Sequence, residues 1–284
     1  MMERLVIVDS NYLAYKAKIT THELSFNGVK TGVIFGFFNQ LLTIGRKLGR
    51  NETVFCWDSR KSLRREMYPD YKKKRRQEQT EEEEKSWEAA HRQFNVLRKG
   101  ILPDLGFSNV FMQKKYEADD IIAKLVMENE CDDKPIVVTS DDDLLQLLDH
   151  CDIYNLGKDE FVTAKNFKDK YGITPSQWVE VKKIAGCTSD NVKGIQGVGV
   201  KKAIQFIRGE MNPDSKTYKK IIEGRSTIDF NEKLVKLPLN GTRDFELNEN
   251  KFSTIEFCRM CRDYGIRVLR DDKKLQEWRS YFIT

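Results

Sequence analysis

The sequence predicts an α/β fold with a central, mostly parallel sheet that is flanked by helices. Three short runs, Leu5–Val8, Thr53–Trp57 and Pro135–Ser140, are apolar for most of their length. Such runs are typical of strands buried on both faces of a parallel sheet, because crossover helices cover both faces. Longer amphipathic segments separate the runs, and this alternation favours crossover connections between parallel strands.

Further elements continue the alternation along the chain. We expect helices at residues 31–48, 118–129 and 142–149, and short strands at Val110–Met112 and Asp152–Asn155. From Thr174 onward strand signals fade, and helices separated by Gly-rich turns dominate. We therefore place a domain boundary near residue 170, between an α/β core (1–170) and a helical region (171–284).

The last part of the chain, residues 211–284, carries no motif that indicates a function. Helices are expected there near residues 214–223 and 253–264. We interpret them as a packing layer.

The composition is that of a globular protein. The chain has 284 residues, of which 39% are hydrophobic, and 49 Lys and Arg against 44 Asp and Glu give a net charge of +5. The 16 Phe, 10 Tyr and 4 Trp argue against intrinsic disorder. Charged residues interrupt any N-terminal signal, and the apolar stretch Val33–Gly45 is too short to cross a bilayer. We expect a cytoplasmic monomer without a membrane partner.

The six cysteines do not predict a zinc site. Only Cys258 and Cys261 have C-x-x-C spacing, and neither a second pair nor a histidine cluster completes a ligand set. Reduced thiols are the favoured interpretation, as expected in a reducing compartment.

Charges are sorted along the chain rather than mixed. Residues 60–76 contain nine basic residues, and residues 78–84 contain five Glu and no base. A run of charge is more often a solvated helix face than a binding site. Here the basic run follows Asp58 and is interleaved with Tyr68 and Tyr71, which favours contact with the phosphates and bases of a single strand.

Three of the predicted strands end in an aspartate. Asp9, Asp58 and Asp141 each come directly after one of the three apolar runs. The carboxyl ends of parallel strands meet at one edge of a sheet, where ligands bind. Each aspartate alone could equally be the N-cap of the next helix. Three carboxylates at one edge would repel each other unless cations bridge them, and caps alone do not explain all three.

Three acidic segments extend this set: YEADD (116–120), SDDDLLQLL (140–148) and TSDN (188–191). The candidate metal ligands are Asp9, Asp58, Glu117, Asp119, Asp120, Asp141, Asp143 and Asp190. An all-oxygen set suits Mg²⁺ or Mn²⁺ rather than zinc, and two such ions would activate a water and stabilise the leaving group of a phosphodiester. For the YEADD acids, the alternative is favourable charge at a helix N-terminus. The three histidines lie in no such motif, which disfavours histidine-based acid–base chemistry.

A Gly-rich turn, GIQGVGVKK at 194–202, precedes an amphipathic segment. Gly197 and Gly199 let the backbone approach a ligand closely, so that amides and a helix N-terminus can face a phosphate. Lys201 and Lys202 add positive charge. Such a turn often only joins two packed helices, but its place just after Asp190 favours nucleic-acid binding.

Together these motifs resemble the 5′-nuclease superfamily of flap endonucleases, phage 5′-3′ exonucleases and the 5′-nuclease domain of bacterial DNA polymerase I. LVIVD and Asp58 resemble the first two ligand segments of that family. YPDYKKKR, YEADD, TSDDDLLQLL and SDNVKGIQGVGVKKA follow in the family's order, over residues 5–210 in all. The freestanding chain is most similar to the phage type, for which the compartment would be the host cytoplasm.

The resemblance implies a helical arch at about 59–100 and a duplex-binding, helix–hairpin–helix-like element at Gly194–Lys202, often with a bound potassium ion. It implies that one metal ion is served, directly or through waters, by Asp9, Asp58, Glu117, Asp119 and Asp120, and a second mainly by Asp141, Asp143 and Asp190. It assigns Lys72 and Arg75 to catalysis at the scissile phosphate. The candidate nucleic-acid contacts are Tyr71 as a stacking residue, Lys73, Lys74, Arg76, Lys182, Gly197, Gly199, Lys201 and Lys202.

The expected function is that of a Mg²⁺- or Mn²⁺-dependent 5′ nuclease that cuts DNA flaps, nicks or free 5′ ends. RNA–DNA hybrids are a further expected substrate. We expect a role in DNA replication or repair, with a replication protein as a partner. One residue departs from the family pattern: Cys187 stands where the G-D-x-S-D-N motif has its first Asp. Since a thiol is a poor Mg²⁺ ligand, the alternative is a catalytically reduced protein that binds branched DNA. A phosphatase of another α/β family is disfavoured, because Asp9-Ser10-Asn11 lacks the nucleophilic D-x-D.

Overall fold

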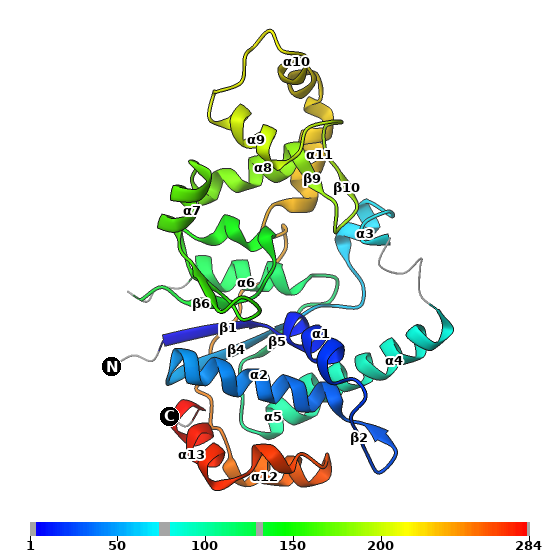
Figure 1. Cartoon of the computed structure of the whole chain (residues 1–284), viewed down its shortest axis with the longest axis vertical. Helices are drawn as coiled ribbons and strands as arrows, with labels where there is room; N and C mark the ends of the chain where they lie inside the picture. Colours follow the sequence, from blue (N-terminus) through cyan, green and yellow to red (C-terminus); the bar gives the residue numbers. More distant parts are fainter. Residues whose placement is uncertain (1–3, 74–79, 129–132, 283–284) are drawn as a thin grey trace.

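The computed structural model of the chain describes residues 4–73, 80–128 and 133–282. Its centre is a six-stranded sheet with the order β5-β4-β1-β6-β7-β8 (Figure 1). The strands are β1 (Arg4–Asp9), β4 (Asn51–Trp57), β5 (Val110–Met112), β6 (Ile136–Val138), β7 (Asp152–Asn155) and β8 (Glu160–Val162). All neighbouring pairs are parallel except β7 and β8. The prediction of a mostly parallel sheet flanked by helices is confirmed.

Alternating side chains along β1 divide the core between the two faces of the sheet. Val6 and Val8 pack on one face, whereas Ile7 packs on the other. The first face is covered by α1 (Ser10–Thr21), α2 (Gly32–Leu48), α4 (Glu81–Val96), α12 (Thr254–Asp263) and α13 (Asp272–Phe282). The second face carries α6 (Ala118–Met127), α7 (Ala164–Tyr171), α8 (Trp178–Ala185), α9 (Val200–Ile207), α10 (Lys216–Glu223) and α11 (Arg225–Val235). Burial on both faces explains why β1, β4 and β6 are apolar for most of their length.

The predicted helices and strands are present, with small shifts at their ends. Helix α2 matches 31–48, α6 matches most of 118–129, and β5 and β7 match the two short strands. The segment predicted as a helix at 142–149 is a 3₁₀-helix, Asp142–Leu147, the tighter form that short helical pieces adopt. The other short elements are β2 (Ser25–Phe26), β3 (Val29–Lys30), α3 (Leu63–Met67), a π-helix (Leu97–Ile101), α5 (Leu102–Asp104), β9 (Gly186–Cys187), β10 (Val192–Lys193) and 3₁₀-helices at Pro175–Gln177 and Arg267–Leu269.

The C-terminal helices return to the sheet domain. In Figure 1, α8 to α11 lie above the sheet, whereas α12 and α13 lie below it, beside α2. Phe38 of α2 contacts Phe257 and Trp278, with ring centroids 5.9 and 6.0 Å away. Helices α10 and α12 confirm the two helices expected in this part, while the boundary near residue 170 stays a prediction. Among the described residues, no helix is both long enough and apolar enough to cross a bilayer.

Nucleic-acid contacts are expected in two parts of the fold: the segment between β4 and β5, and the Gly-rich turn. Helix α4 begins at a capping box in which Thr80 and Glu83 bond each other's backbone, so its acidic first turn stabilises the helix start. Helices α8 and α9 flank the turn, where Ile195 N donates to Ile184 O at 2.8 Å and Gly197 has φ +78°. The arch and the helix–hairpin–helix-like element stay predictions.

Candidate metal centre and active site

Four carboxylates from separate segments line one pocket of about 350 Å³. Asp9 ends β1, Asp58 follows β4, Asp141 follows β6, and Asp119 lies in the first turn of α6. Since β4, β1 and β6 are neighbours in the sheet, the side chains at their carboxyl ends meet at one edge. The remaining lining residues are Asn11, Tyr12, Tyr15, Lys72, Thr139, Ser140, Asp142, Lys182 and Ser189.

Asp9 both caps a helix and faces the pocket. Its Oδ1 accepts a hydrogen bond from Tyr12 N at 3.0 Å, which starts α1, and its Oδ2 accepts one from Thr139 Oγ1 at 3.0 Å. The N-cap and ligand interpretations of this aspartate are therefore compatible, because the cap fixes the carboxylate at the pocket wall.

Asp58 and Asp141 are fixed in the same manner. Asp58 Oδ1 accepts from Ala118 N at 2.8 Å, and the Asp58 N–H donates to Asn11 Oδ1 at 3.0 Å. Asp141 Oδ1 accepts from Asp143 N at 2.8 Å. Backbone amides thus hold one oxygen of each carboxylate, from the start of α6 for Asp58 and from the 3₁₀-helix for Asp141.

The pocket concentrates negative charge. Burial, with repulsion from Asp58 as the next cause, raises the pKa of Asp9 to about 7. Surrounding protein atoms and the charge of Asp143 raise the pKa of Asp141 to about 6, although its side chain stays accessible from the pocket. Burial and the charges of Asp141 and Asp9 raise the pKa of Asp119 well above its ordinary value. A bound cation would relieve this repulsion.

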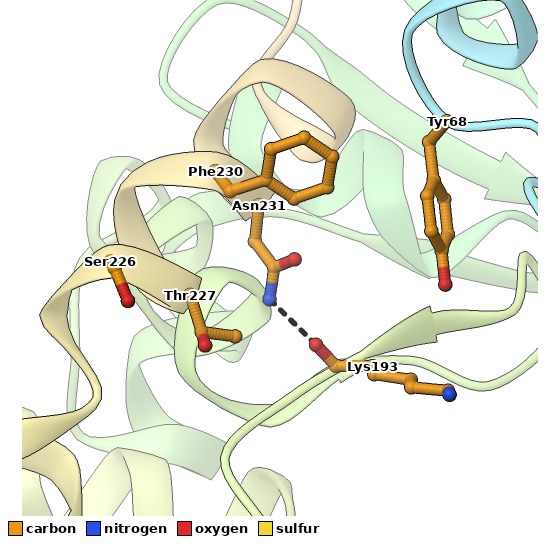
Figure 2. A pocket seen from close by; sticks show the side chains of 6 residues that line it. All are labelled: Tyr68, Lys193, Ser226, Thr227, Phe230 and Asn231. Carbon is orange, nitrogen blue, oxygen red and sulfur yellow. Dashed lines mark hydrogen bonds between the residues drawn. The ribbon is translucent and has the colours of Figure 1, made fainter.

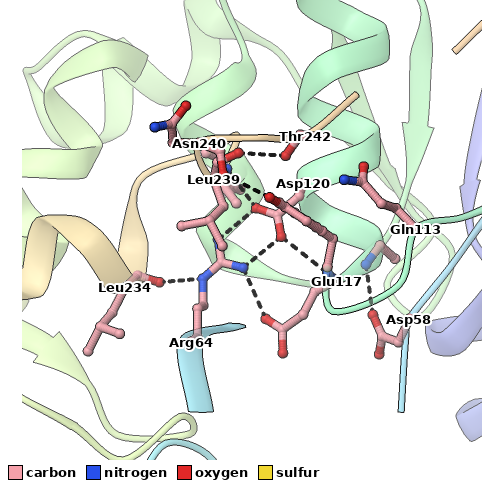
Figure 3. A network of polar contacts seen from close by, with 12 residues as sticks. Asp58, Arg64, Gln113, Glu117, Asp120, Leu234, Leu239, Asn240 and Thr242 are labelled. Atoms are coloured by element: carbon pink, nitrogen blue, oxygen red, sulfur yellow. Dashed lines mark hydrogen bonds and ion pairs between the residues drawn. The ribbon is translucent and has the colours of Figure 1, made fainter. Parts of the chain in front are cut away.

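Asp120 does not join the pocket. Arg64 Nη1 and Nη2 donate to the two Asp120 oxygens at 2.7 Å, and Arg64 Nε donates to Leu234 O at 2.8 Å (Figure 3). Leu239 N also donates to Asp120, at 2.9 Å. The prediction that Asp120 serves a metal ion is therefore corrected: its carboxylate is fully buried and engaged by Arg64, a member of the basic run.

Glu117 lies at the centre of a second buried cluster. Lys72 Nζ lies 2.9 Å from Glu117 Oε1 and 3.7 Å from Asp190 Oδ2. The Tyr71 hydroxyl lies 2.9 Å from Glu117 Oε2 and 3.0 Å from Asp190 Oδ2, so its one proton is shared between them. Burial alone would raise the pKa of Glu117, but Lys72 and Arg64 outweigh it and lower that pKa.

This cluster corrects the predicted role of Tyr71. The side chain is 3% exposed, and its hydroxyl is bound to two carboxylates, so its ring cannot stack on a base in this structure. Nothing in the basic run itself signals this burial, because the partners come from other segments.

A group of mixed ligands lies beside the pocket. One donor atom each from Asp143, Cys187 and Asp190 lies within 4.8 Å of the others, so together they could hold a metal ion. Lys182 Nζ forms an ion pair with Asp143 Oδ1 at 2.5 Å. Lys182, predicted to contact nucleic acid, is thus directed at the predicted second metal site, and its DNA contact stays a prediction.

The remaining basic candidates lie outside the pocket. Lys73, Lys201 and Lys202 are exposed; Lys73 pairs with Asp70 at 3.0 Å, and Lys202 donates to Gly197 O at 2.9 Å. Gly197 and Gly199 are exposed in the turn before α9. Lys74, Arg75 and Arg76 lie outside the described residues.

Three residues with clear structural roles were missed at the sequence level: Asn11, Arg64 and Thr139. Asn11 accepts a hydrogen bond from Asp58 N and stands two residues after Asp9. Thr139 donates a hydrogen bond to Asp9 and stands two residues before Asp141. That spacing is the only available signal. Arg64 carries none, since it looks like any other member of the basic run.

The donors present fit divalent cations. Asp9, Asp58, Asp119 and Asp141, with Asp142 also in the lining, offer carboxylate oxygens, the ligands that hard ions such as Mg²⁺ or Mn²⁺ prefer. The second group adds a sulfur from Cys187.

A second hollow, of about 270 Å³, lies between α11 and β10 (Figure 2). The rings of Tyr68 and Phe230 meet edge to face at 5.8 Å, and Asn231 Nδ2 donates to Lys193 O at 3.0 Å. The described residues that line it include no carboxylate, so the acidic pocket is the candidate active site.

Proteins similar in sequence to this chain include an exonuclease and a DNA polymerase. A 5′-3′ exonuclease of Bacillus subtilis is 31% identical over 218 residues, which cover 72% of this chain and 70% of that protein. DNA polymerase I of Deinococcus radiodurans is 30% identical over 249 residues; they cover 82% of this chain but only 25% of the polymerase, so the chain spans about a quarter of that relative.

Two solved structures share the fold. The T5 D15 protein crystallised with metal ions has a TM-score of 0.71 at 21% identity, covering 83% of this chain and 90% of its own. The catalytic core of Rad2 in complex with DNA substrate has a TM-score of 0.60 at 15% identity, covering 100% and 93%.

Residues 4–172 match the family described as 5′-3′ exonuclease, N-terminal resolvase-like domain. The match contains β1, β4, β6 and the four carboxylates of the pocket. The chain belongs to the 5′-3′ exonuclease family.

Proposed function

We propose that the chain is a divalent-metal-dependent 5′ nuclease that hydrolyses phosphodiester bonds of DNA at 5′ flaps, nicks or free 5′ ends. The observation that carries the proposal is the meeting of Asp9, Asp58, Asp119 and Asp141 in one pocket with Lys72 among its lining residues. Family membership supports the same chemistry. Structures of Rad2 with DNA substrate and of human GEN1 with Holliday junction DNA support DNA as the substrate class.

The proposed ions are divalent: Mg²⁺ or Mn²⁺ is held by Asp9, Asp58 and Asp119, and a second divalent ion is held mainly by Asp141, Asp143 and Asp190. A bound divalent ion supplies charge that makes water a better nucleophile and stabilises the leaving oxygen. The chain's own residues prepare this site: backbone amides and Thr139 fix the carboxylates, as at Asp9 and Asp141. Glu117 holds the ammonium group of Lys72 within reach of the pocket.

Substrate binding in this proposal uses two groups of positive charge, one in the basic run after Asp58 and one at the Gly-rich turn. Lys72 and Arg75 stabilise the phosphate being cut, since a fixed cation there offsets the charge that develops. Lys201, Lys202 and the amides of the Gly194–Lys202 turn grip the duplex backbone, with a K⁺ ion at the turn. The same proposal includes an RNA–DNA hybrid as alternative substrate, a replication protein as partner and a monomeric state. It also includes nucleic-acid contacts by Lys73, Lys74, Arg76 and Lys182.

Cleavage of 5′-end-labelled flap DNA by the purified chain, with Mg²⁺ or Mn²⁺, tests the proposal. Wild-type protein should release short labelled products, and chelation with EDTA should stop their release. The folded Asp141→Asn variant is the matched control for a contaminating nuclease. Absence of products with either ion, from protein with a cooperative unfolding transition, would refute the proposal.

One observation favours a second candidate, a catalytically reduced protein that binds branched DNA. Cys187 replaces a carboxylate in the second ligand group, where its Sγ lies 3.8 Å from Asp143 Oδ2. Tight flap binding without turnover would support this candidate. Activity in the Cys187→Asp variant would then locate the defect at the second ion.

A further inference from the structure

The second ligand group differs in chemistry from the pocket beside it. Asp143 lies in the 3₁₀-helix after β6, Cys187 ends β9, and Asp190 lies in the loop between β9 and β10. Their three donor atoms lie within 4.8 Å of one another. The Cys187 side chain is 7% exposed, so its sulfur is held within the fold rather than in open solvent.

A cation already lies at this group. The ammonium group of Lys182, on α8, lies 2.5 Å from Asp143 Oδ1, and its side chain is 11% exposed. A largely buried lysine directed at a carboxylate shows that the group attracts positive charge. An incoming metal ion must displace this ammonium group, so a ligand with strong affinity for that ion is needed.

We propose that Cys187 gives the second cation site a sulfur ligand, so that this site prefers thiophilic divalent ions such as Zn²⁺ or Cd²⁺ over Mg²⁺. Sulfur ligands select such ions, whereas Mg²⁺ binds oxygen and keeps its waters. Two carboxylates and one sulfur are three protein ligands, the number found in open zinc sites rather than in closed structural ones. The inference rests on the proposed metal dependence. It adds that the first site binds an ion that prefers oxygen ligands, whereas the second binds a thiophilic ion.

Titration of Cd²⁺ into reduced, EDTA-treated protein without DNA tests the inference. Cadmium bound to sulfur gives an ultraviolet charge-transfer band, so the readout is independent of activity. A Cys258→Ser background removes the Cys258–Cys261 pair as a competing site, since Cys258 is partly exposed. In that background we expect one saturable band, which Cys187→Ser abolishes and which Cys151→Ser, the control at a buried thiol elsewhere, leaves intact.

Two further variants keep the inference open to refutation if Cys187→Ser unfolds. Cys187→Asp should lose the band and bind Mg²⁺ roughly tenfold or more tightly, measured by calorimetry. Lys182→Met should strengthen Cd²⁺ binding, because the competing ammonium group is gone. A band that persists without Cys187, or equal Mg²⁺ binding by wild type and Cys187→Asp, would overturn the inference. Either result would leave the nuclease proposal standing, since cleavage is measured separately.

Discussion

The ammonium group of Lys72 lies 2.9 Å from the carboxylate of Glu117, in a buried cluster that also holds the Tyr71 hydroxyl. The backbone at Lys72 has φ +55°, a conformation that side-chain-bearing residues rarely adopt, and its N–H donates to Asp190 O at 2.8 Å. Strain of this kind persists only where the surroundings enforce it, and it is frequent at functional sites. The fold therefore fixes this cation beside the pocket before DNA binds.

Replacing Lys72 with Ala should slow cleavage more than it weakens DNA binding. The loss of a fixed cation near the scissile phosphate is expected to lower the single-turnover rate roughly a hundredfold or more. Flap DNA affinity, measured by fluorescence anisotropy, should change only a few-fold. The control is Lys165→Ala, at an exposed lysine of α7 that pairs with Asp169. Equal losses of rate and affinity would make Lys72 an ordinary phosphate contact.

Replacing Arg64 with Ala should lower the free energy of unfolding by roughly 3–5 kcal/mol, because it leaves the Asp120 carboxylate buried without its partner. Urea unfolding measures this change, and Arg60→Ala, at an exposed member of the same basic run, should cost less than about 0.5 kcal/mol. The double variant Arg64→Met/Asp120→Leu should recover only part of the loss, because the backbone amides of Glu117 and Leu239 then lose their acceptor. An Arg64→Ala protein as stable as wild type would contradict the structural role of the pair.

Metal-free protein should become less stable as the pH rises from about 4 to about 7. The pKa of Asp9 is about 7 in the fold, against an ordinary value of 3.8, so the folded state holds this proton more tightly than the unfolded state does. The stability from this one group is present below pH 4 and is lost as the pH rises to about 7, by roughly 4 kcal/mol at most.

Thermal unfolding in EDTA across that range measures the effect. Asp9→Asn should flatten the profile, and Mg²⁺ or Mn²⁺ should raise Tm more at pH 8 than at pH 5, since only the ionised carboxylates bind the ion. A profile that Asp9→Asn leaves unchanged would show that another group governs it.

Replacing Asp141 with Asn should abolish most cleavage while DNA affinity is retained. The change keeps the shape of the side chain but removes a charge that faces the pocket. We expect a loss of roughly a hundredfold or more in rate. Asp149→Asn, at an exposed position after the 3₁₀-helix, is the matched control. Unchanged turnover would remove Asp141 from the site.

Duplex binding should weaken steeply with salt, because neutralising phosphates releases counterions. The double variant Lys201→Ala/Lys202→Ala should reduce the slope of log K against log salt by about 1 for each phosphate that these lysines neutralise in the wild type. Lys273→Ala, at an exposed position on α13, should leave the slope unchanged. The same slope in all three proteins would place the duplex elsewhere.

The sheet and the pocket carboxylates at its edge could be predicted from the sequence, since apolar runs that end in aspartate fix both the strands and where their ends meet. The residues that pair with carboxylates inside the fold, such as Arg64 and Tyr71, could not be predicted. Asp120 looks like its neighbour Asp119, and only Arg64, 56 positions earlier in the chain, separates their roles. Tyr71 is buried by a loop 119 positions later. Packing between distant segments decides these cases, and local pattern carries no trace of it.

The pocket draws its walls from β1, β4, α6, the residues after β6, and the loop before β10. No short contiguous fragment of the chain contains all of them, and the last core helices, α12 and α13, still follow. During synthesis, this pocket therefore cannot assemble until the chain has grown past Ser189, about two thirds of the way to its end.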